Sequence, residues 1–406
     1  MYRQANLLAL RWRLSQVHWR PPATSDRTSV LPGDIAVNKL APVRAAWATS
    51  RLYRHPIDSN CYLLRGVSRP TGFWVAVCLN QPAYAELLLR AAGAAILPRV
   101  TMRALKELPL LPPPPEAPAL AERAWSLLDA ILAGEESLSR LAEAAMDRTC
   151  PPETLHFWQH QIATETTNWW RRVPRASLSD SLVPGHALFD ILRHHLRDEL
   201  AWEPLDRFLA PEQPHRSRLP VALPGPPRLR CLRISDVATD FTAARIPEPQ
   251  AVEWPGRVYR DPLRREEVLV SLLVSSPTVA FAGEIPRQEI HVTDHWERMR
   301  FRETPGAWAI ILNSPLVRMQ MRLLARGSAR QFLNSGALSQ LLVPNIPRDE
   351  REHWDRALRR YQHDRLEAEA AWDRLWNDAL EVFHRVHRAA GAMLAAPADT
   401  RGVHTI

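Results

Sequence analysis

Arginine is the residue of this sequence with the most evident chemistry. Lysine and arginine together number 52 against 44 acidic residues, which gives a formal net charge of +8. Because Lys39 and Lys106 are the only lysines, almost all of the positive charge is arginine. A planar guanidinium binds phosphate oxygens and guanine edges through paired N–H donors. The excess favours a polyanionic partner such as nucleic acid, although an arginine-rich codon usage would give the same composition.

Two other kinds of side chain could bind a partner or a metal. Trp169 and Trp170 stand beside three arginines in "NWWRRVPR". Such a cluster can stack on bases or form a protein interface, and we expect the protein interface. Two helical histidine spacings, His156 with His160 and His384 with His387, could hold a metal. With 15 histidines in the chain such pairs arise by chance, so we expect no metal site.

Motifs for catalysis are missing from the sequence. It contains no G-x-x-x-x-G-K-[ST] loop, no G-x-S-x-G elbow and no glycine-rich turn for a dinucleotide. Lys39 follows Asp34 without the E-x-K element of common nucleases, and "DPLRR" at Asp261 is not the aromatic-ended loop of amino-methyltransferases. We therefore predict no catalytic residues, no cofactor and no enzymatic activity. An enzyme that uses the histidines is an open alternative.

The elements that would position these residues occur twice. An offset of 233 links Asn80 to Asn313 in "LN-x-P" and continues over about 80 residues. Each copy begins with an acidic residue and a predicted strand, "DIAVNKL" or "EVLVSLL", and continues with a second predicted strand, "FWVAVCL" or "AWAIIL". We expect the two asparagines to cap the start of the helix that follows. A glycine break, a short helix and a proline-rich end complete each copy.

A helix with a heptad pattern of apolar residues follows each copy, over residues 119–147 and 350–393. Such seams favour pairing by knobs-into-holes packing. The two helices are therefore expected to pack on each other as a spacer. A single heptad helix lying on a globular core is the alternative.

In these features the chain resembles the specificity subunit of type I restriction–modification systems. The resemblance covers residues 30–150 and 228–393 and includes "LRCLRISDVATDFTAARIPEP" as an opening strand pair. It implies an α+β fold with two target-recognition modules, each followed by a long helix, and the helices paired as a coiled-coil spacer. The expected domains are a first, abbreviated target-recognition domain at 1–115, a spacer helix at 116–148, a helical Trp- and Pro-rich insert at 149–227, a second target-recognition domain at 228–348, a long helix at 349–394 and a disordered tail at 395–406.

The resemblance also selects residues for DNA contact, on loops between strands and at the break between the terminal helices. In the first copy these are Lys39, Arg44, Arg51, Arg54, Arg99 and Arg103. In the second copy they are Arg264, Arg265, Arg298, Arg300, Arg302, Arg326, Arg330 and Gln331. We expect Trp169, Trp170, Trp372 and Trp376 to bind a partner protein.

The function expected from the resemblance is sequence-specific recognition of a bipartite target in double-stranded DNA. The partners would be DNA methyltransferase subunits and, in the same complex, a nuclease or translocase subunit. The abbreviated first copy and the insert depart from the family pattern, so a non-catalytic scaffold of a phage-defence complex is the alternative. No apolar run is long enough to span a membrane and no signal peptide is evident, so a cytoplasmic protein with reduced cysteines is expected.

Overall fold

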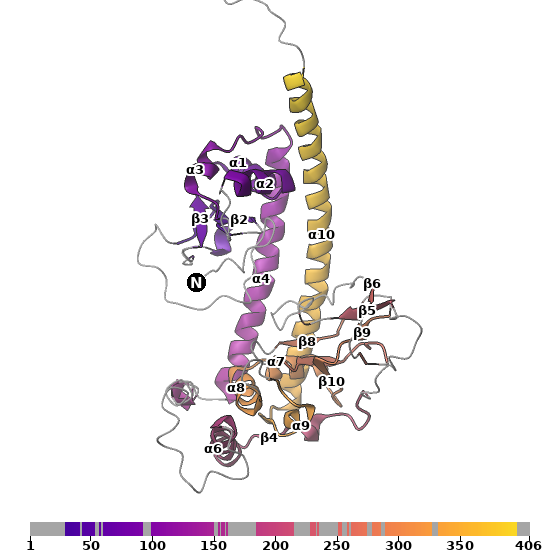
Figure 1. Cartoon of the computed structure of the whole chain (residues 1–406). Helices are drawn as coiled ribbons and strands as arrows, with labels where there is room; N and C mark the ends of the chain where they lie inside the picture. The colour runs from indigo at the N-terminus through magenta and orange to yellow at the C-terminus, as the bar shows by residue number, and fades with distance from the viewer. Residues whose placement is uncertain are drawn as a thin grey trace, which may run out of the picture. The chain divides into compact units, whose positions relative to one another are not determined.

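The computed structural model describes residues 29–395 except 41–42, 53–56, 58–59, 92–98, 150–152, 155, 159, 161–183, 215–227, 233, 235–250, 254–257, 260, 274–277, 286–288 and 327–331. The chain forms two compact units (Figure 1). The first unit combines Met1–Ala133 with Glu367–Ile406, and the second is Gly134–Leu366. Two long helices, α4 (Ala117–Thr149) and α10 (Arg348–Ala395), each contribute residues to both units.

The first unit contains a three-stranded antiparallel sheet in the order β2-β1-β3. Three helices and a short 3-10 turn accompany the sheet. The elements are β1 (Ile35–Asn38), β2 (Ala45–Trp47), η2 (Ser50–Leu52), β3 (Cys61–Leu64), α1 (Arg69–Leu79), α2 (Pro82–Ala91) and α3 (Met102–Glu107).

Both long helices line the core of the first unit. Leu120, Ala124 and Leu128 of α4 lie in one hydrophobic cluster with Leu375 and Ala379 of α10. Next to this cluster, Arg123 forms an ion pair of 3.1 Å with Asp378. A helix that buries one apolar stripe is stabilised mainly by such packing rather than by its intrinsic propensity.

The second unit repeats the arrangement of the first. Its sheet has the order β10-β7-β8, and all pairs are again antiparallel. The equivalent elements are β7 (Val268–Ser271), β8 (Val279–Phe281), β10 (Trp296–Met299), α7 (Pro305–Leu312), α8 (Pro315–Leu324) and α9 (Ser335–Leu338). We call residues 34–115 the first copy and residues 267–347 the second copy.

The second unit also contains elements for which the described part of the first unit has no counterpart. These are α6 (Pro184–Asp198), β4 (Glu203–Pro204), η5 (Leu205–Phe208), β5 (Arg228–Leu232), β6 (Ala251–Glu253) and β9 (His291–Val292). The short strand β11 (Leu342–Val343) pairs with β4. Helix α6 packs against α8 and buries Phe189, Leu192 and Leu196 in the main core of the unit. Helix α6 and strand β4 lie within the insert expected at 149–227, and they are therefore part of the folded second unit.

The second apolar segment of each copy is a helix, not the strand that the sequence suggested. "FWVAVCL" lies in α1 and "AWAIIL" in α7. Helix α1 begins after Ser68, whose side chain accepts a hydrogen bond from Thr71 N, and α7 has Pro305 in its first turn. Both helices are buried on nearly all sides, which removes the 3.6-residue alternation that would have distinguished a helix from a buried strand.

The two asparagines of "LN-x-P" end helices rather than begin them. Asn80 is the C-terminal cap of α1 and Asn313 that of α7. Each side chain donates to the carbonyl four residues earlier, Ala76 O at 2.7 Å and Ala309 O at 3.0 Å. The expected N-terminal capping role is therefore wrong.

In the described part of the chain, no helix combines the length and apolar character needed to cross a bilayer. The side chains of Cys61, Cys78 and Cys231 are buried.

Candidate nucleic-acid interface

The same hydrogen bonds shape one end of the sheet in both copies. In the first copy the Asn38 side chain accepts from Arg44 N and donates to Leu40 O at 2.9 Å. In the second copy Ser271 occupies this place. Its hydroxyl accepts from Thr278 N at 3.3 Å and donates to Leu273 O at 2.9 Å. A polar residue at the end of the central strand therefore holds the turn to the next strand in each copy.

An acidic residue anchors the opposite end of each sheet. Asp34 accepts the N–H of Leu31 at 2.8 Å and pairs with Arg65 at 2.8 Å. Glu267 is the equivalent acid, and Arg300 is the equivalent of Arg65, with an ion-pair distance of 2.8 Å. Charge-assisted pairs of this kind fix backbone geometry more firmly than neutral hydrogen bonds do.

Cationic side chains gather where β1 ends and where β2 and β3 begin. We call Lys39, Arg44 and Arg99, together with Asn60 and Tyr62, the first tip. Backbone bonds join it, since Lys39 N donates to Asn60 O at 2.9 Å and Leu40 bridges to Arg99. The Arg99 guanidinium donates to the Asn60 side chain at 2.9 Å, and the Lys39 ammonium lies 4.3 Å from the Tyr62 ring centre. Arg44 and Arg99 are exposed.

The second tip has the same backbone but different side chains. Leu272 N donates to His295 O at 2.8 Å, which matches the bond from Lys39 to Asn60. Phe332, at the place of Arg99, bridges both Leu273 and Arg326. Its ring lies 5.7 Å from that of His295 in an edge-on arrangement. We call His295, Arg326 and Phe332 the second tip.

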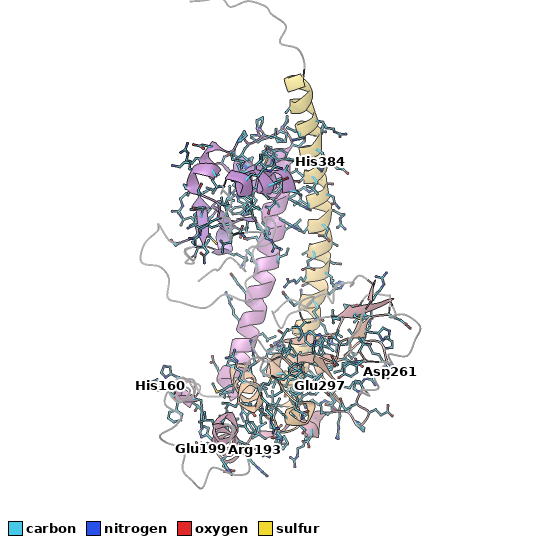
Figure 2. The ribbon with its side chains drawn as sticks, in the orientation of Figure 1. His160, Arg193, Glu199, Asp261, Glu297 and His384 are labelled. Atoms are coloured by element: carbon cyan, nitrogen blue, oxygen red, sulfur yellow. The ribbon has the colours of Figure 1, made fainter. Side chains whose placement is uncertain are left out.

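Glu297 occupies in the second copy the place that Tyr62 has in the first. It lies on β10 and is labelled in Figure 2, which draws the described side chains of both units. Phe332 is 37% exposed, so part of its ring is accessible to a partner.

The two tips support different modes of contact. A guanidinium carries five N–H donors, so the bond from Arg99 to Asn60 leaves donors for a phosphate or a guanine edge. At the second tip, an exposed phenyl ring beside a histidine and Arg326 suits stacking against a base together with one ionic contact. The fold thus presents two chemically distinct surfaces on one repeated frame.

Three of the other residues predicted for DNA contact form ion pairs with nearby acids. Arg51 lies 3.5 Å from Asp129, Arg103 lies 2.7 Å from Glu107, and Arg265 lies 2.9 Å from Glu284. Arg302 donates to the carbonyl of Leu209 at 2.9 Å, and Arg264 is exposed beside β7. Of the remaining predicted residues, Arg54, Arg330, Gln331, Trp169 and Trp170 lie outside the described residues.

Arg298 needs a correction, because its side chain is fully buried. It lies on β10, not on a loop, and its guanidinium donates to Glu267 at 2.8 Å and to Pro262 O at 2.8 Å. A cation with all of its contacts inside the protein cannot reach DNA. Arg300 shares the same carboxylate and is only partly exposed, so it too has a structural role in the sheet.

One of the two C-terminal tryptophans is placed differently from the expectation. Trp372 is buried in the core of the first unit, so its ring stabilises the packing of α10 and is not available to a partner. Trp376 is partly buried against that core, and its expected role in partner binding stays a prediction.

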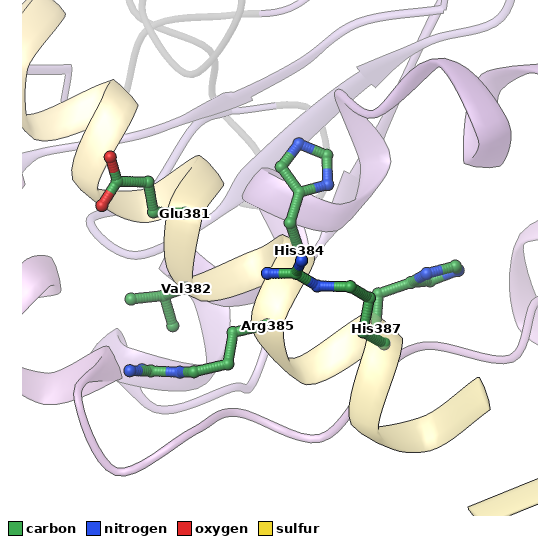
Figure 3. A pocket seen from close by; sticks show the side chains of 6 residues that line it. Glu381, Val382, His384, Arg385 and His387 are labelled. Atoms are coloured by element: carbon green, nitrogen blue, oxygen red, sulfur yellow. The ribbon is translucent and has the colours of Figure 1, made fainter. Parts of the chain in front are cut away.

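The histidines of α10 border a shallow groove. Glu381, Val382, His384, Arg385, His387 and Arg388 line it (Figure 3). His387 stacks on Phe383 with ring centres 5.9 Å apart, and Arg385 pairs with Glu116. Over the residues that the structure describes, no group of three or more histidine, cysteine, aspartate or glutamate side chains could hold a metal ion.

No protein-family model matches this chain, and no curated protein does. Three solved structures similar to it come from type I restriction–modification systems. An HsdS subunit from Thermoanaerobacter tengcongensis is 13% identical over 89% of this chain and 83% of that chain, with a TM-score of 0.24. A chain from a structure of the assembly and conformational transition of the type I system is 15% identical over 91% and 83%, with a TM-score of 0.25. The S subunit from M. genitalium is 10% identical over 95% and 90%, with a TM-score of 0.32.

Proposed function

We propose that this protein is a non-catalytic DNA-specificity subunit that directs a DNA methyltransferase to a two-part target. The observation that carries the proposal is one backbone frame, built twice, with different side chains at the same place. A protein that reads a single motif needs one such surface. Two unlike surfaces on one chain suit two half-sites of different sequence.

The first tip supports contact with phosphates and guanine edges. Lys39, Arg44 and Arg99 lie together at this tip, where the Arg99 guanidinium donates to the Asn60 side chain. Arginine is the side chain most often used for guanine, through two parallel hydrogen bonds to its major-groove edge. Contacts to phosphates would position the module, and contacts to base edges would specify the sequence.

The second tip supports contact through Phe332, His295 and Arg326. Aromatic rings bind bases by stacking with little regard to sequence, so specificity at this tip would depend on Arg326 and His295. Arg330 and Gln331, which follow Arg326 in the sequence, remain proposed contacts of the same surface.

The long helices would form the spacer and bind the methyltransferase. In the first unit α4 and α10 share one hydrophobic cluster. In the second unit Gly134 of α4 faces Tyr361 of α10 so closely that a Cβ on Gly134 would lie 3.1 Å from the ring. These contacts support a paired-helix spacer. A nuclease or translocase subunit would join the same complex.

Replacing Lys39, Arg44 and Arg99 with Gln tests the proposal. The matched control replaces Arg140, Arg207 and Arg360, which are exposed and paired with acids four residues away on helical turns. Both triple variants lose three positive charges. We expect the tip variant to lose at least about tenfold in DNA affinity. The slope of log affinity against log salt concentration should become shallower by up to about 3, since each phosphate contact contributes about 0.9 to this slope. The control should change both quantities little.

The isolated chain should bind DNA weakly and with steep salt dependence. With a cognate methyltransferase, binding should become tight and sequence-selective, because both modules would then contact their half-sites together. DNA binding that is absent with and without the methyltransferase would support the scaffold alternative. Methylation, cleavage or ATP hydrolysis by the isolated chain would overturn the non-enzymatic assignment.

A further inference from the structure

One face of α8 is completely covered in the second copy. Leu316, Gln320 and Leu323 lie along this face at helical spacing, with exposed fractions of 0%, 0% and 7%. Helix α6 packs against α8. The Gln320 side chain also exchanges two hydrogen bonds of 2.9 Å with the backbone of Leu342 in β11. Strand β11 is in turn paired with β4, which follows α6 in the chain.

The same face of α2 is open in the described part of the first copy. Subtracting the offset of 233 from the numbers of these three α8 residues gives their counterparts in α2. The counterparts are Ala83, Leu87 and Arg90, and all three are exposed. Leu87 is 48% exposed, where its counterpart Gln320 is fully buried. Leu110, the counterpart of Val343 in β11, is 36% exposed. Leu87 and Leu110 are thus exposed apolar side chains, and their counterparts lie in elements that contact α6 or β4 in the second copy.

The N-terminal segment repeats the sequence of the covering elements. "ANLLALRWRLSQVHWRP" at 5–21 aligns with "ALFDILRHHLRDELAWEP" at 187–204, with a one-residue slip after Leu14. The shared positions are Ala5 and Ala187, Leu7 and Phe189, Leu10 and Leu192, Arg11 and Arg193, Leu14 and Leu196, Trp19 and Trp202, and Pro21 and Pro204.

The matched positions are the ones that the second copy buries. Phe189, Leu192, Leu196 and Trp202 are between 0% and 3% exposed in the second unit. Leu7, Leu10 and Leu14 repeat the spacing of the first three of these residues, which places one apolar stripe on one face of a helix. Residues such as Ala9 and Ser15, whose counterparts Ile191 and Arg197 are exposed in the second unit, would then face away from that stripe.

We propose that residues 5–21 form the counterpart of α6 and β4 and dock on the α2 face that contains Leu87. Leu7, Leu10 and Leu14 would cover Leu87, and the segment around Arg20 would lie along Leu110 as β4 lies along β11. One bond of the second copy would be missing, because Leu205 N donates to Leu341 O and its counterpart Pro22 has no N–H. The two hydrogen bonds between Gln320 and Leu342 would also be missing, because Leu87 has no polar side chain.

With residues 5–21 docked, the two copies would differ mainly in the length of the segment that follows β4 or its counterpart. Asp34 follows Trp19 by 15 positions, whereas Glu267 follows Trp202 by 65. The additional 50 positions contain β5 and β6, which form a separate sheet with β9. Leu232 of β5 and Val292 of β9 pack on Leu269 and Trp296 of the β10-β7-β8 sheet. Residues 184–204 would then be the beginning of the second repeat, and the segment with β5 and β6 would be an insertion into it.

Cysteine labelling of the full chain tests this docking without DNA or a partner, so the result is independent of the proposed function. Leu87→Cys reports on the covered face, and Glu86→Cys, at an exposed neighbouring position, is the matched control. A maleimide should modify Leu87→Cys about tenfold or more slowly than Glu86→Cys, because a covered side chain reacts only after local opening. Peptide mass spectrometry separates these sites from the native cysteines.

A second set of variants identifies the occupant of the face. Adding Leu7→Asp, Leu10→Asp and Leu14→Asp should raise the Leu87→Cys rate to that of Glu86→Cys. The control set Ala9→Asp, Ser15→Asp and Gln16→Asp should leave that rate slow, because the counterparts of these residues in the second unit are exposed. Circular dichroism and thermal melting would show that each variant is folded. Equal rates for Leu87→Cys and Glu86→Cys in the otherwise unchanged chain would overturn the proposal. So would protection that persists after the three leucines are replaced, since another occupant would then cover the face.

Discussion

The side-chain amide of Asn80 donates a hydrogen bond of 2.7 Å to the carbonyl oxygen of Ala45, 35 residues earlier in the chain. The Asn80 side-chain oxygen also accepts from Ala45 N at 3.1 Å. One side chain therefore satisfies both backbone groups of a residue at the start of β2 and joins the end of α1 to the sheet. In the second copy the side-chain amide of Asn313 donates a corresponding hydrogen bond to Val279 O at 3.4 Å.

Replacing Asn80 with Ala should destabilise the first unit. Two backbone groups of Ala45 would lose their partner, and a buried polar group without a partner costs about 1–3 kcal/mol. Hydrogen exchange should show faster exchange in residues 35–91 and little change in residues 268–324. Asn345→Ala removes an exposed hydrogen bond with Glu203 and should change stability by less than about 0.5 kcal/mol.

Replacing Glu267 with Gln should destabilise the second unit more strongly. The fully buried Arg298 would keep its charge and lose its carboxylate partner, a loss that costs about 3–5 kcal/mol for buried pairs. The double variant Glu267→Gln, Arg298→Met should recover part of that loss because it removes the uncompensated cation. Denaturant unfolding of the two variants measures the difference. Equal stability of the single and double variants would show that Arg298 does not depend on Glu267.

The double variant Leu375→Asp, Val382→Asp should disrupt the packing of α10 in the first unit. Leu375 is 1% exposed, so a carboxylate at this position would be buried without a partner, and Val382 is partly buried against the same core, so its replacement removes further apolar packing. We expect a loss of several kcal/mol, at least about 3, and a lower melting temperature. Arg374→Asp with Asn377→Asp places two carboxylates on the exposed side of the same helix and should leave the melting temperature nearly unchanged.

The stability of the first unit should fall as pH rises above about 9. Burial raises the pKa of the Cys78 thiol from 9.0 to about 12. In the unfolded chain the thiol loses its proton near its ordinary pKa, while in the folded chain it holds the proton until the pH approaches 12, so the stabilisation is complete below pH 9 and is lost between pH 9 and 12. Burial also raises the pKa of Tyr84, which acts in the same direction.

Cys78→Val tests the contribution of the thiol to this pH dependence. The variant keeps an apolar side chain of similar size and should show a shallower fall in melting temperature between pH 9 and 11. An unchanged fall would assign the effect to Tyr84 instead.

The sequence offset predicted the repeat because the two copies share hydrogen-bonding residues as well as apolar ones. Asn80 and Asn313, and the acids Asp34 and Glu267, stand at one constant offset and have equivalent contacts in the structure. The type of the second apolar element was not predictable from its residues. A fully buried segment has no polar face, so its β-branched and aromatic residues suggested a strand where tertiary packing produces a helix.

The candidate interface was predictable only in part. Lys39, Arg44 and Arg99 were selected from their loops, and the structure brings them together at one end of the sheet. Asn60, His295 and Phe332 were missed because they carry no distinctive motif, and because small slips move the first two to an offset of 235. Arg298 was misplaced because the strand that contains it was taken for a loop.

Helix α10 determines the order in which the chain can fold during synthesis. Its C-terminal half supplies Trp372, Leu375, Ala379 and Phe383 to a core whose other members begin at Ile35. A ribosome adds these residues after Leu366, by which point every residue of the second unit has been made. The second unit can therefore fold before the first, and the N-terminal module keeps an open apolar surface until residues 367–383 have been added. A chaperone that shields this surface would act after synthesis of the second unit, and a truncation after residue 366 would leave the second unit intact and the first without the α10 part of its core.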